Sequence, residues 1–361
     1  MAVDVLLCHA LVLAHDPVER RLMTPYFPLG LLYLAAALRE AGYRVAFYDG
    51  CFEPDLASFE RALDEHTPRL VGIAALSTVR ANALELARRA KRRGLPVVVG
   101  GADPTGCPED YLAQREDGHC LVDAVVIGEG EATLVELVPA LLGLSGARDL
   151  ADIHGIAYRH NGEPIRAAAR SLSDINALPL PARDLVDLEA YQRAWREAHG
   201  YSSLAVIASR GCPFACAWCQ KSVFGRTCRL RAPEAVAAEM AMLRDRYHPD
   251  QVRLVDDVLG IERDWVRRFR DAVQAHGTAT PFECLSRVDL VDRETLTWLR
   301  EAGCVRIQFG AESGSQKVLD AMAKGTRVSQ IHAAAALCRE LGIATYFFIM
   351  VGYPGEEWED I

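Results

Sequence analysis

Short apolar runs alternate with amphipathic stretches over the first ~140 residues of the chain. Short apolar runs are typical of buried parallel strands, and apolar residues three and four positions apart are typical of helices that cover them. The expected strands are 3–8, 45–48, 70–75, 97–99 and 124–127. The expected helices are 29–40, 56–66, 81–93 and 132–142. This order predicts a doubly wound, Rossmann-like (flavodoxin-like) α/β domain.

Ligands of such sheets bind at the carboxyl ends of the strands. The connections expected there are loops at 10–26, 49–54, 77–80, 100–108 and 128–131. After this domain, 156–159 and the turn Asn161-Gly162 predict a small hairpin. The prolines of 178–182 predict an extended linker, because each disfavours helix at the residue before it.

A second series of strands and helices begins near residue 204. Its expected strands are 204–208, 251–255, 282–285, 305–309 and 345–350. Its expected helices are 233–246, 262–276, 294–302 and 328–341. Five such units predict a partial β/α (TIM-like) barrel, and we expect it to be incomplete because the sequence stops just after the fifth strand. The predicted domains are 1–145, a connector with the hairpin at 146–198, and the barrel at 199–361.

Composition narrows the classes of function. The 361 residues carry a net charge of −9, which disfavours a nucleic-acid-binding surface. The densest basic run, 88–93, lies in a helical pattern beside acidic residues, as expected of a solvated helix face. No apolar run reaches the ~20 residues of a membrane span, and the N-terminus lacks the basic region of a signal peptide. We therefore expect a cytoplasmic protein without a membrane span.

The chain has 11 cysteines, and in a reducing compartment they are not expected to form disulfides. Cys212, Cys216 and Cys219 have the spacing C-x3-C-x2-C, directly after an expected strand. Three thiolates suit an iron–sulfur cluster with one open iron, whereas structural zinc sites use four ligands. A zinc site with His248 or Cys228 as the fourth ligand is the alternative.

The segment 211–219 resembles the cluster motif of the radical S-adenosylmethionine (SAM) enzymes, including the aromatic Trp218 before the third cysteine. The resemblance implies a [4Fe–4S] cluster on Cys212, Cys216 and Cys219, which are the catalytic and metal-ligating residues. In that family the open iron binds SAM, and an electron from the cluster cleaves SAM to methionine and a 5′-deoxyadenosyl radical. Strand ends near 255–257, 310–314 and 348–356 resemble those that contact SAM in the family. The SAM contacts that the resemblance implies are Trp218, Asp256, Asp257, Arg287, Glu312, Ser313, Val351 and Gly352.

Two of these assignments have equally plausible local alternatives. Asp256 and Asp257 can cap the helix that follows the second barrel strand. Arg287 can form an ion pair with the next helix instead of holding a carboxylate of SAM or substrate.

The front domain resembles the cobalamin-binding domain that is fused to one large class of radical SAM enzymes. The similarity rests on 25–33, 43–49, 97–101 and 128–131, and glycines at the strand ends allow a flat macrocycle to approach the backbone. The cobalamin contacts that it implies are Leu29, Ser77, Gly100, Gly101, Ala102, Asp103, Gly128, Glu129 and Gly130. The cobalt-ligating motif Asp-x-His-x-x-Gly of many cobalamin domains is absent, since 49–53 has no histidine. A flavodoxin-like domain without cobalamin is therefore the alternative.

With both cofactors, the family resemblance implies methyl transfer to an unactivated carbon of a small molecule, with flavodoxin or ferredoxin as electron donor. A cobalamin-dependent cyclase or rearrangement enzyme of the anaerobic magnesium-protoporphyrin ester cyclase type is the alternative reaction. A methylthiotransferase would need a second cluster, but Cys8, Cys51, Cys107 and Cys120 are scattered and read as core cysteines. A regulatory module that binds cobalamin or zinc is the non-enzyme alternative.

Overall fold

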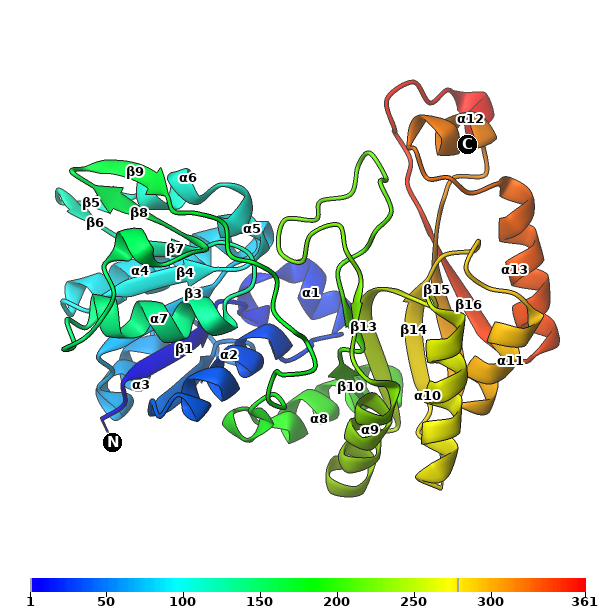
Figure 1. Ribbon diagram of the computed structural model, residues 1–361, viewed down its shortest axis with the longest axis horizontal. Helices are drawn as coiled ribbons and strands as arrows, with labels where there is room; N and C mark the ends of the chain where they lie inside the picture. The colour runs from blue at the N-terminus through cyan, green and yellow to red at the C-terminus, as the bar shows by residue number, and fades with distance from the viewer. Residues whose placement is uncertain (1, 278) are drawn as a thin grey trace. The chain divides into compact units, whose positions relative to one another are not determined.

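A computed structural model describes residues 2–277 and 279–361 of the chain. The chain divides into two compact units, Met1–Leu188 (unit 1) and Glu189–Ile361 (unit 2). Each unit is an α/β structure, as the sequence predicts (Figure 1). The predicted domain boundaries after residues 145 and 198 stay a prediction.

Unit 1 contains a seven-stranded sheet in the order β2-β1-β3-β4-β7-β8-β9. Its strands are β1 (Val5–His9), β2 (Val45–Asp49), β3 (Leu70–Ala74), β4 (Val97–Gly100), β7 (Ala124–Val126), β8 (Ile156–His160) and β9 (Glu163–Arg166). A two-stranded ribbon consists of β5 (Arg115–Glu116) and β6 (His119–Cys120). The helices are α1 (Pro17–Leu22), α2 (Leu29–Glu40), α3 (Ser58–His66), α4 (Arg80–Arg92), α5 (Ala102–Gly106), α6 (Pro108–Leu112) and α7 (Glu131–Leu141).

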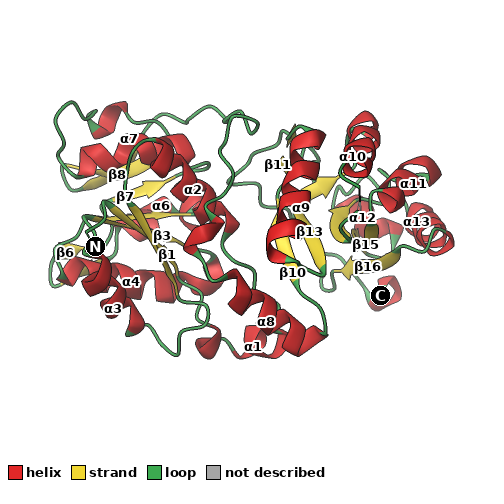
Figure 2. Ribbon diagram, turned by 90° about the horizontal axis from the view of Figure 1, so that it is seen from below, coloured by secondary structure: helices red, strands yellow, loops and turns green. Residues whose placement is uncertain are grey.

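Alternate residues of each strand point to opposite faces of the sheet. Both faces of its parallel part are apolar and are covered by helices, which makes the sheet doubly wound. Leu6 and Cys8 belong to the core under α3 and α4, whereas Val5 and Leu7 belong to the core under α2 and α7. Figure 2 shows these two helix pairs on opposite sides of the strands. Strand β1 lies between β2 and β3, so the order reverses there and the carboxyl edge is the expected ligand side.

Two features of unit 1 differ from the expectation. The predicted hairpin is present, but β8 pairs antiparallel with β7 and extends the main sheet instead of standing in a connector. Helices α1 and α5 occupy segments that were expected to be loops, and α6 lies in a stretch after residue 108 for which no element was expected. Each has only five or six residues, too few for a periodic pattern, and α1 and α6 start at Pro17 and Pro108.

Unit 2 contains a five-stranded parallel sheet in the order β10-β13-β14-β15-β16, the arrangement of a partial β/α barrel. Its strands are β10 (Ser203–Val206), β13 (Gln251–Leu259), β14 (Phe282–Ser286), β15 (Cys304–Glu312) and β16 (Ala344–Ile349). The helices are α8 (Leu188–His199), α9 (Pro233–Tyr247), α10 (Arg263–Ala275), α11 (Arg293–Glu301), α12 (Gln316–Ala321) and α13 (Val328–Glu340). A short ribbon pairs β11 (Ser209–Arg210) with β12 (Arg229–Leu230).

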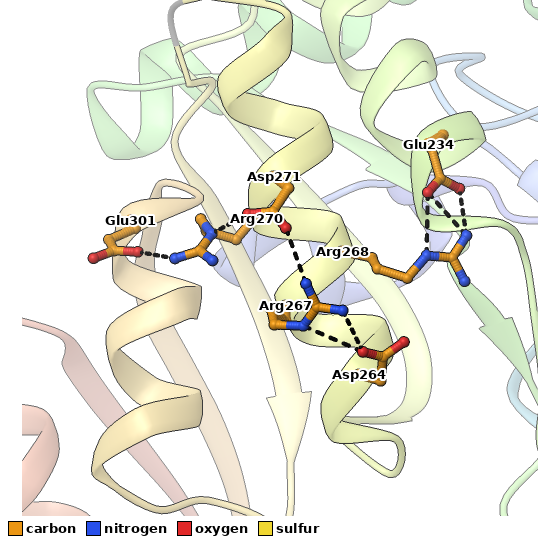
Figure 3. A network of polar contacts seen from close by, with 7 residues as sticks. All are labelled: Glu234, Asp264, Arg267, Arg268, Arg270, Asp271 and Glu301. Atoms are coloured by element: carbon orange, nitrogen blue, oxygen red, sulfur yellow. Dashed lines mark hydrogen bonds and ion pairs between the residues drawn. The ribbon is translucent and has the colours of Figure 1, made fainter.

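Helices α9, α10, α11 and α13 cover one face of the unit 2 strands (Figures 1 and 2). Trp265 and Phe269 of α10 stack at 5.1 Å, and Phe269 meets Phe282 of β14 edge-on at 5.7 Å. On the outer side, Arg268 pairs with Glu234 of α9 and Arg270 with Glu301 of α11 (Figure 3). The helices therefore hold their order through apolar packing inside and charge pairing outside.

The basic run on α4 is paired with acidic side chains, as the interpretation of a solvated helix face predicts. Arg92 contacts Glu116 at 2.7 Å, and Arg93 contacts Asp64 at 2.6 Å and Glu60 at 2.9 Å. Among the described residues, no helix combines the length and apolar character that crossing a bilayer requires.

Candidate cluster and cofactor sites

The three cysteines of the C-x3-C-x2-C motif lie in one loop, 211–228, that the ribbon β11–β12 closes at its base. Gly211 opens this loop with φ +84°, and a Cβ there would stand 2.1 Å from the carbonyl oxygen of Thr227. Only glycine tolerates both that backbone angle and that approach. Glycine directly before Cys212 is therefore required by the way in which the loop closes.

The cysteines of this cluster loop are free thiols, as are all eleven in the chain. Burial raises the pKa of the Cys219 thiol, the Lys221 ammonium opposes that shift, and the Cys212 and Cys216 thiols add to it. Across residues 2–277 and 279–361, no three His, Cys, Asp or Glu side chains converge to metal-ligating distance. Three free thiols on one glycine-hinged loop, beside the cations Lys221 and Arg287, are a donor set that fits an anionic iron–sulfur cluster.

Two adjacent carboxylates of β13 hold the entrance of the cluster loop. Asp256 Oδ1 accepts from the backbone N–H of Ala208, at 2.8 Å, and from that of Ser209. Asp257 Oδ2 accepts from the N–H of Gly211 at 3.0 Å. These residues were expected at the strand end or as caps of the next helix. Instead, they lie inside β13, where the pairing with β14 shifts register between Leu254 and Leu259.

Asp256 is almost completely buried, and its Oδ2 has no hydrogen-bond partner in the described part of the chain. Burial raises the pKa of Asp256 to about 7, although the backbone donors of Ser209 and Ala208 counteract the shift. The carboxyl is therefore partly protonated at neutral pH.

Arg287, which follows β14, points its guanidinium at the cluster loop. Its Nη1 lies 3.6 Å from Cys216 Sγ, and its Cζ lies 3.7 Å from the centroid of the Phe214 ring. Nε and Nη2 bind Asp289 at 2.9 and 3.0 Å, and Nη2 also donates to the carbonyl of Lys324 at 2.7 Å. The ion pair expected with the next helix is instead made with Asp289, in the connection before α11.

The end of β15 carries a buried ion pair. Lys324 Nζ contacts Glu312 Oε1 at 2.9 Å, and each side chain is only 6% exposed. Ser313, the next residue, is also buried, and its hydroxyl oxygen accepts a hydrogen bond from the backbone N–H of Ser315. Trp218 in the cluster loop is 40% exposed. Lys324 Nζ lies 5.8 Å from the Trp218 ring centroid. After β16, Val351 is exposed and Gly352 has φ +89°.

The two candidate fourth ligands of a zinc site differ in position. His248 caps the carboxyl end of α9 and is exposed at the amino edge of the sheet, before β13 begins, whereas the cluster loop follows β10 at the carboxyl edge. Cys228 lies at the base of the loop, where burial raises its pKa to about 11. The alternative prediction of a zinc site with His248 as the fourth ligand is therefore wrong.

The candidate cobalamin residues of unit 1 lie at the carboxyl edge of the sheet. Ser77 follows β3, Gly100 ends β4, and Gly101 directly precedes α5, which starts with Ala102 and Asp103. Gly128, Glu129 and Gly130 connect β7 to α7, and Leu29 is the buried first residue of α2. A Cβ on Gly101, at φ +112°, would stand 2.6 Å from the carbonyl oxygen of Ala75. Glycine at 101 is thus required by its close packing against the chain that follows β3.

Two polar candidates at this edge already have protein partners. Arg80 grips Asp103 through two hydrogen bonds of 2.6 and 2.7 Å and lowers the pKa of that carboxyl, and Tyr111 donates to it at 2.5 Å. Glu129 Oε2 accepts from the N–H of Ser173 at 2.9 Å. Both carboxylates therefore brace loops of unit 1.

Sequence reasoning missed apolar side chains at the same edge. Leu76, between β3 and Ser77, is 56% exposed, and Phe52, after β2, is 43% exposed. Large apolar residues directly after buried strands are the signal that points to such positions, since an apolar macrocycle needs apolar contacts. By contrast, Cys8 and Cys51 are fully buried, as the interpretation of core cysteines predicts. Cys107 and Cys120 are only partly buried, so the interpretation is wrong in placing them in the core.

Family models match both units. The model of the B12 binding domain covers residues 20–138, and the model of the Radical SAM superfamily covers residues 206–361. Both agree with the resemblances that the glycines of the front domain and the three-cysteine motif indicate.

Similar proteins share this pair of domains. The chain is 31% identical over 340 residues to an uncharacterized methyltransferase of Pyrococcus horikoshii, covering 92% of this chain and 71% of that one. It is 28% identical over 338 residues to an anaerobic magnesium-protoporphyrin IX monomethyl ester cyclase of Synechocystis, covering 88% and 64%. The fold matches the radical SAM methyltransferase TsrM from Kitasatospora setae, solved with cobalamin and a [4Fe–4S] cluster, with a TM-score of 0.80, 22% identity, and coverage of 100% and 71%.

The chain thus spans about two thirds of the length of these proteins. The cysteine loop at the carboxyl edge of a partial β/α barrel, the doubly wound front unit and a similarity that covers both units of this chain lead to one family. The chain belongs to the radical SAM enzymes that carry a B12-binding domain.

Proposed function

We propose that this enzyme transfers a methyl group from SAM to an unactivated carbon of a small molecule. The observation that carries the proposal is the pairing of the three-thiol loop in unit 2 with a B12-binding unit 1 in one chain. When bound, the cluster supplies the electron that cleaves SAM to a carbon-centred radical, and cobalamin supplies the methyl group.

The residues of the chain have separate tasks in this proposal. Cys212, Cys216 and Cys219 hold the cluster, and Asp256 and Asp257 fix the entrance of its loop through backbone N–H groups. Trp218 is exposed enough to contact SAM, and Glu312 and Ser313, with Val351 and Gly352, provide polar and backbone contacts at neighbouring strand ends. Unit 1 holds cobalamin with its glycine-rich carboxyl edge, with Leu29, Leu76 and Ser77 against the macrocycle. A small redox protein such as flavodoxin or ferredoxin supplies single electrons.

The first experiment tests the radical SAM step. The protein is purified without oxygen and reconstituted with iron and sulfide. Dithionite and SAM are then added, and 5′-deoxyadenosine is measured by mass spectrometry. The variant Cys212→Ala/Cys216→Ala/Cys219→Ala should bind no cluster and form no product, whereas Cys228→Ala, a free cysteine at the base of the same loop, should retain both. Absence of iron from the parent protein, or loss of metal in Cys228→Ala, would contradict the assignment.

The cyclase reaction is the second candidate, because one relative carries that name. The two reactions consume SAM differently. Methyl transfer to an unactivated carbon would consume two molecules of SAM: one gives up its methyl group and leaves S-adenosylhomocysteine, and the other is cleaved reductively to methionine and 5′-deoxyadenosine. The cyclase would need only the reductive cleavage. A methyltransferase supplied with hydroxocobalamin and reductant should form S-adenosylhomocysteine that carries none of the label of CD3-SAM. Formation of 5′-deoxyadenosine alone would favour the cyclase.

A further inference from the structure

We propose that Arg287 is a positioning residue that clamps the cluster loop and donates to the sulfur of Cys216, instead of binding SAM. The inference rests on the proposed function, since it takes the three cysteines as cluster ligands. It concerns how the protein retains the cluster and sets its reduction potential.

The donors of the guanidinium are already directed within the protein. Nε and Nη2 face the carboxylate of Asp289, and Nη2 reaches the carbonyl of Lys324. Nη1 is directed at Cys216 Sγ at 3.6 Å. Arg287 is 5% exposed, so a carboxylate of SAM would have to displace these partners in a buried position.

The guanidinium plane also lies close over Phe214, with 3.7 Å between Cζ and the ring centroid. Phe214 stands between the first two cysteines, so the stack fixes the same stretch of loop that the sulfur contact fixes. Cations stack strongly on aromatic faces when water is excluded. Arginine suits this position because its planar fork allows stacking and several directed N–H bonds at once.

A second tie connects the loop to the same anchoring segment. The N–H of Ala217 donates to the carbonyl of Met322 at 2.9 Å, two residues before Lys324. Lys324 in turn holds Glu312 at the end of β15. The cluster loop is thus bound to the segment 322–324 directly through Ala217 and indirectly through Arg287.

Two physical effects follow from this geometry. Side chains that orient metal ligands slow the loss of the metal, and their removal costs about 10- to 100-fold in affinity. A cation and an N–H donor at a cluster sulfur stabilise the reduced, more negative state and so raise the reduction potential. Arg287 should therefore both retain the cluster and ease its reduction.

The test compares holoproteins of the parent, Arg287→Gln, Arg287→Lys and Phe214→Leu, with Arg267→Gln as the matched control. Arg267 pairs with Asp264 and Asp271 on the exposed side of α10 (Figure 3), so its replacement removes the same charge but none of the contacts to the cluster loop described above. Transfer of iron to a chelator is timed without oxygen. The reduction potential is measured by titration followed by electron paramagnetic resonance.

Arg287→Gln and Phe214→Leu should release iron about 10- to 100-fold faster than the parent and Arg267→Gln. Arg287→Gln should also have a more negative reduction potential. Arg287→Lys keeps the charge but cannot stack and donate together, so it should release iron faster while its reduction potential changes less. Rates and potentials equal to those of Arg267→Gln would overturn the inference. If Arg287→Gln fails to fold, Phe214→Leu decides, because it leaves the guanidinium paired with Asp289.

Failure of the clamp and failure of the proposed function give different results. A parent protein without iron refutes the cluster assignment itself. A parent protein that holds its cluster, with Arg287 variants that match it, refutes only the clamp.

Discussion

The replacement Asp256→Asn should remove a pH dependence of stability that is built into unit 2. Asparagine keeps the size of the side chain and the Oδ1 that accepts from Ala208 and Ser209. It replaces the buried Oδ2, which has no partner among the described residues, with a group that cannot ionise. The variant therefore isolates the cost of the buried charge.

The magnitude follows from the pKa of Asp256, which burial raises from its ordinary value of 3.8 to about 7. Between these values the folded state binds a proton that the unfolded state has lost, so stability falls as the pH rises from about 4 to about 7. At ~1.4 kcal/mol per pH unit, the loss reaches ~4 kcal/mol above pH 7. The neighbouring thiols of Cys228 and Cys284 do not titrate in this range, since their pKa values are raised above the ordinary thiol value.

Tryptophan fluorescence provides a selective assay, because all five tryptophans lie in unit 2: Trp195, Trp218, Trp265, Trp298 and Trp358. Urea unfolding of the cluster-free protein is followed at pH 5, 6, 7 and 8 under reducing conditions. The parent should lose roughly 2 kcal/mol of stability between pH 5 and pH 7 that Asp256→Asn does not lose. Parallel pH profiles of the two proteins would refute the reasoning, because they would place the ionised carboxylate in the folded state at no cost.

Three further substitutions test other parts of the structure. Lys324→Met leaves Glu312 buried without its partner and should lower the free energy of unfolding of unit 2, measured by tryptophan fluorescence, by about 3–5 kcal/mol. The double variant Lys324→Met/Glu312→Leu should recover much of this loss, because no buried charge remains. Equal stabilities of the single and double variants would contradict this. Gly101→Ala should destabilise unit 1 by about 2–3 kcal/mol, because a Cβ would meet the Ala75 carbonyl at a left-handed φ, whereas Gly100→Ala, with its nearest neighbour at 3.5 Å, should change little. Both are read from the circular dichroism transition that tryptophan fluorescence does not follow, since unit 1 has no tryptophan. Tyr111→Phe removes one hydrogen bond to Asp103 and should cost about 1 kcal/mol in the same transition, and an unchanged midpoint would count against the brace at this edge.

Elements with a strong hydrophobic pattern are predictable from the sequence. The helix expected at 29–40 is α2, Leu29–Glu40, and the strand expected at 70–75 is β3, Leu70–Ala74. These segments have a complete apolar stripe or run, and burial then decides their structure. The three cysteines are predictable for a different reason, since their chemistry depends on spacing within a single loop.

The carboxyl end of strand β13 in unit 2 could not be predicted from the apolar pattern. The apolar run of β13 ends before Asp256, and a pair of aspartates reads as a turn or a helix cap. The strand nevertheless continues to Leu259, because the carboxylates find backbone donors in the cluster loop and the register shifts to accommodate them. Partners that are distant in the sequence can thus extend a strand beyond its apolar pattern.

The surroundings of the cluster loop show where prediction from the sequence stops. A parallel sheet brings the carboxyl ends of adjacent strands together, so the sequence indicates that Arg287 and Glu312 lie near the cysteines. It does not indicate their partners. Arg287 meets Cys216, 71 residues away, and Lys324, 37 residues away, while its ion pair is with Asp289 in its own connection. A charged residue at a strand end is typical of a ligand contact. In a buried site, however, its N–H groups donate first to the nearest acceptors of the protein itself. Assigning such a residue to the cofactor or to the loop that holds the cofactor therefore requires the geometry of its hydrogen bonds.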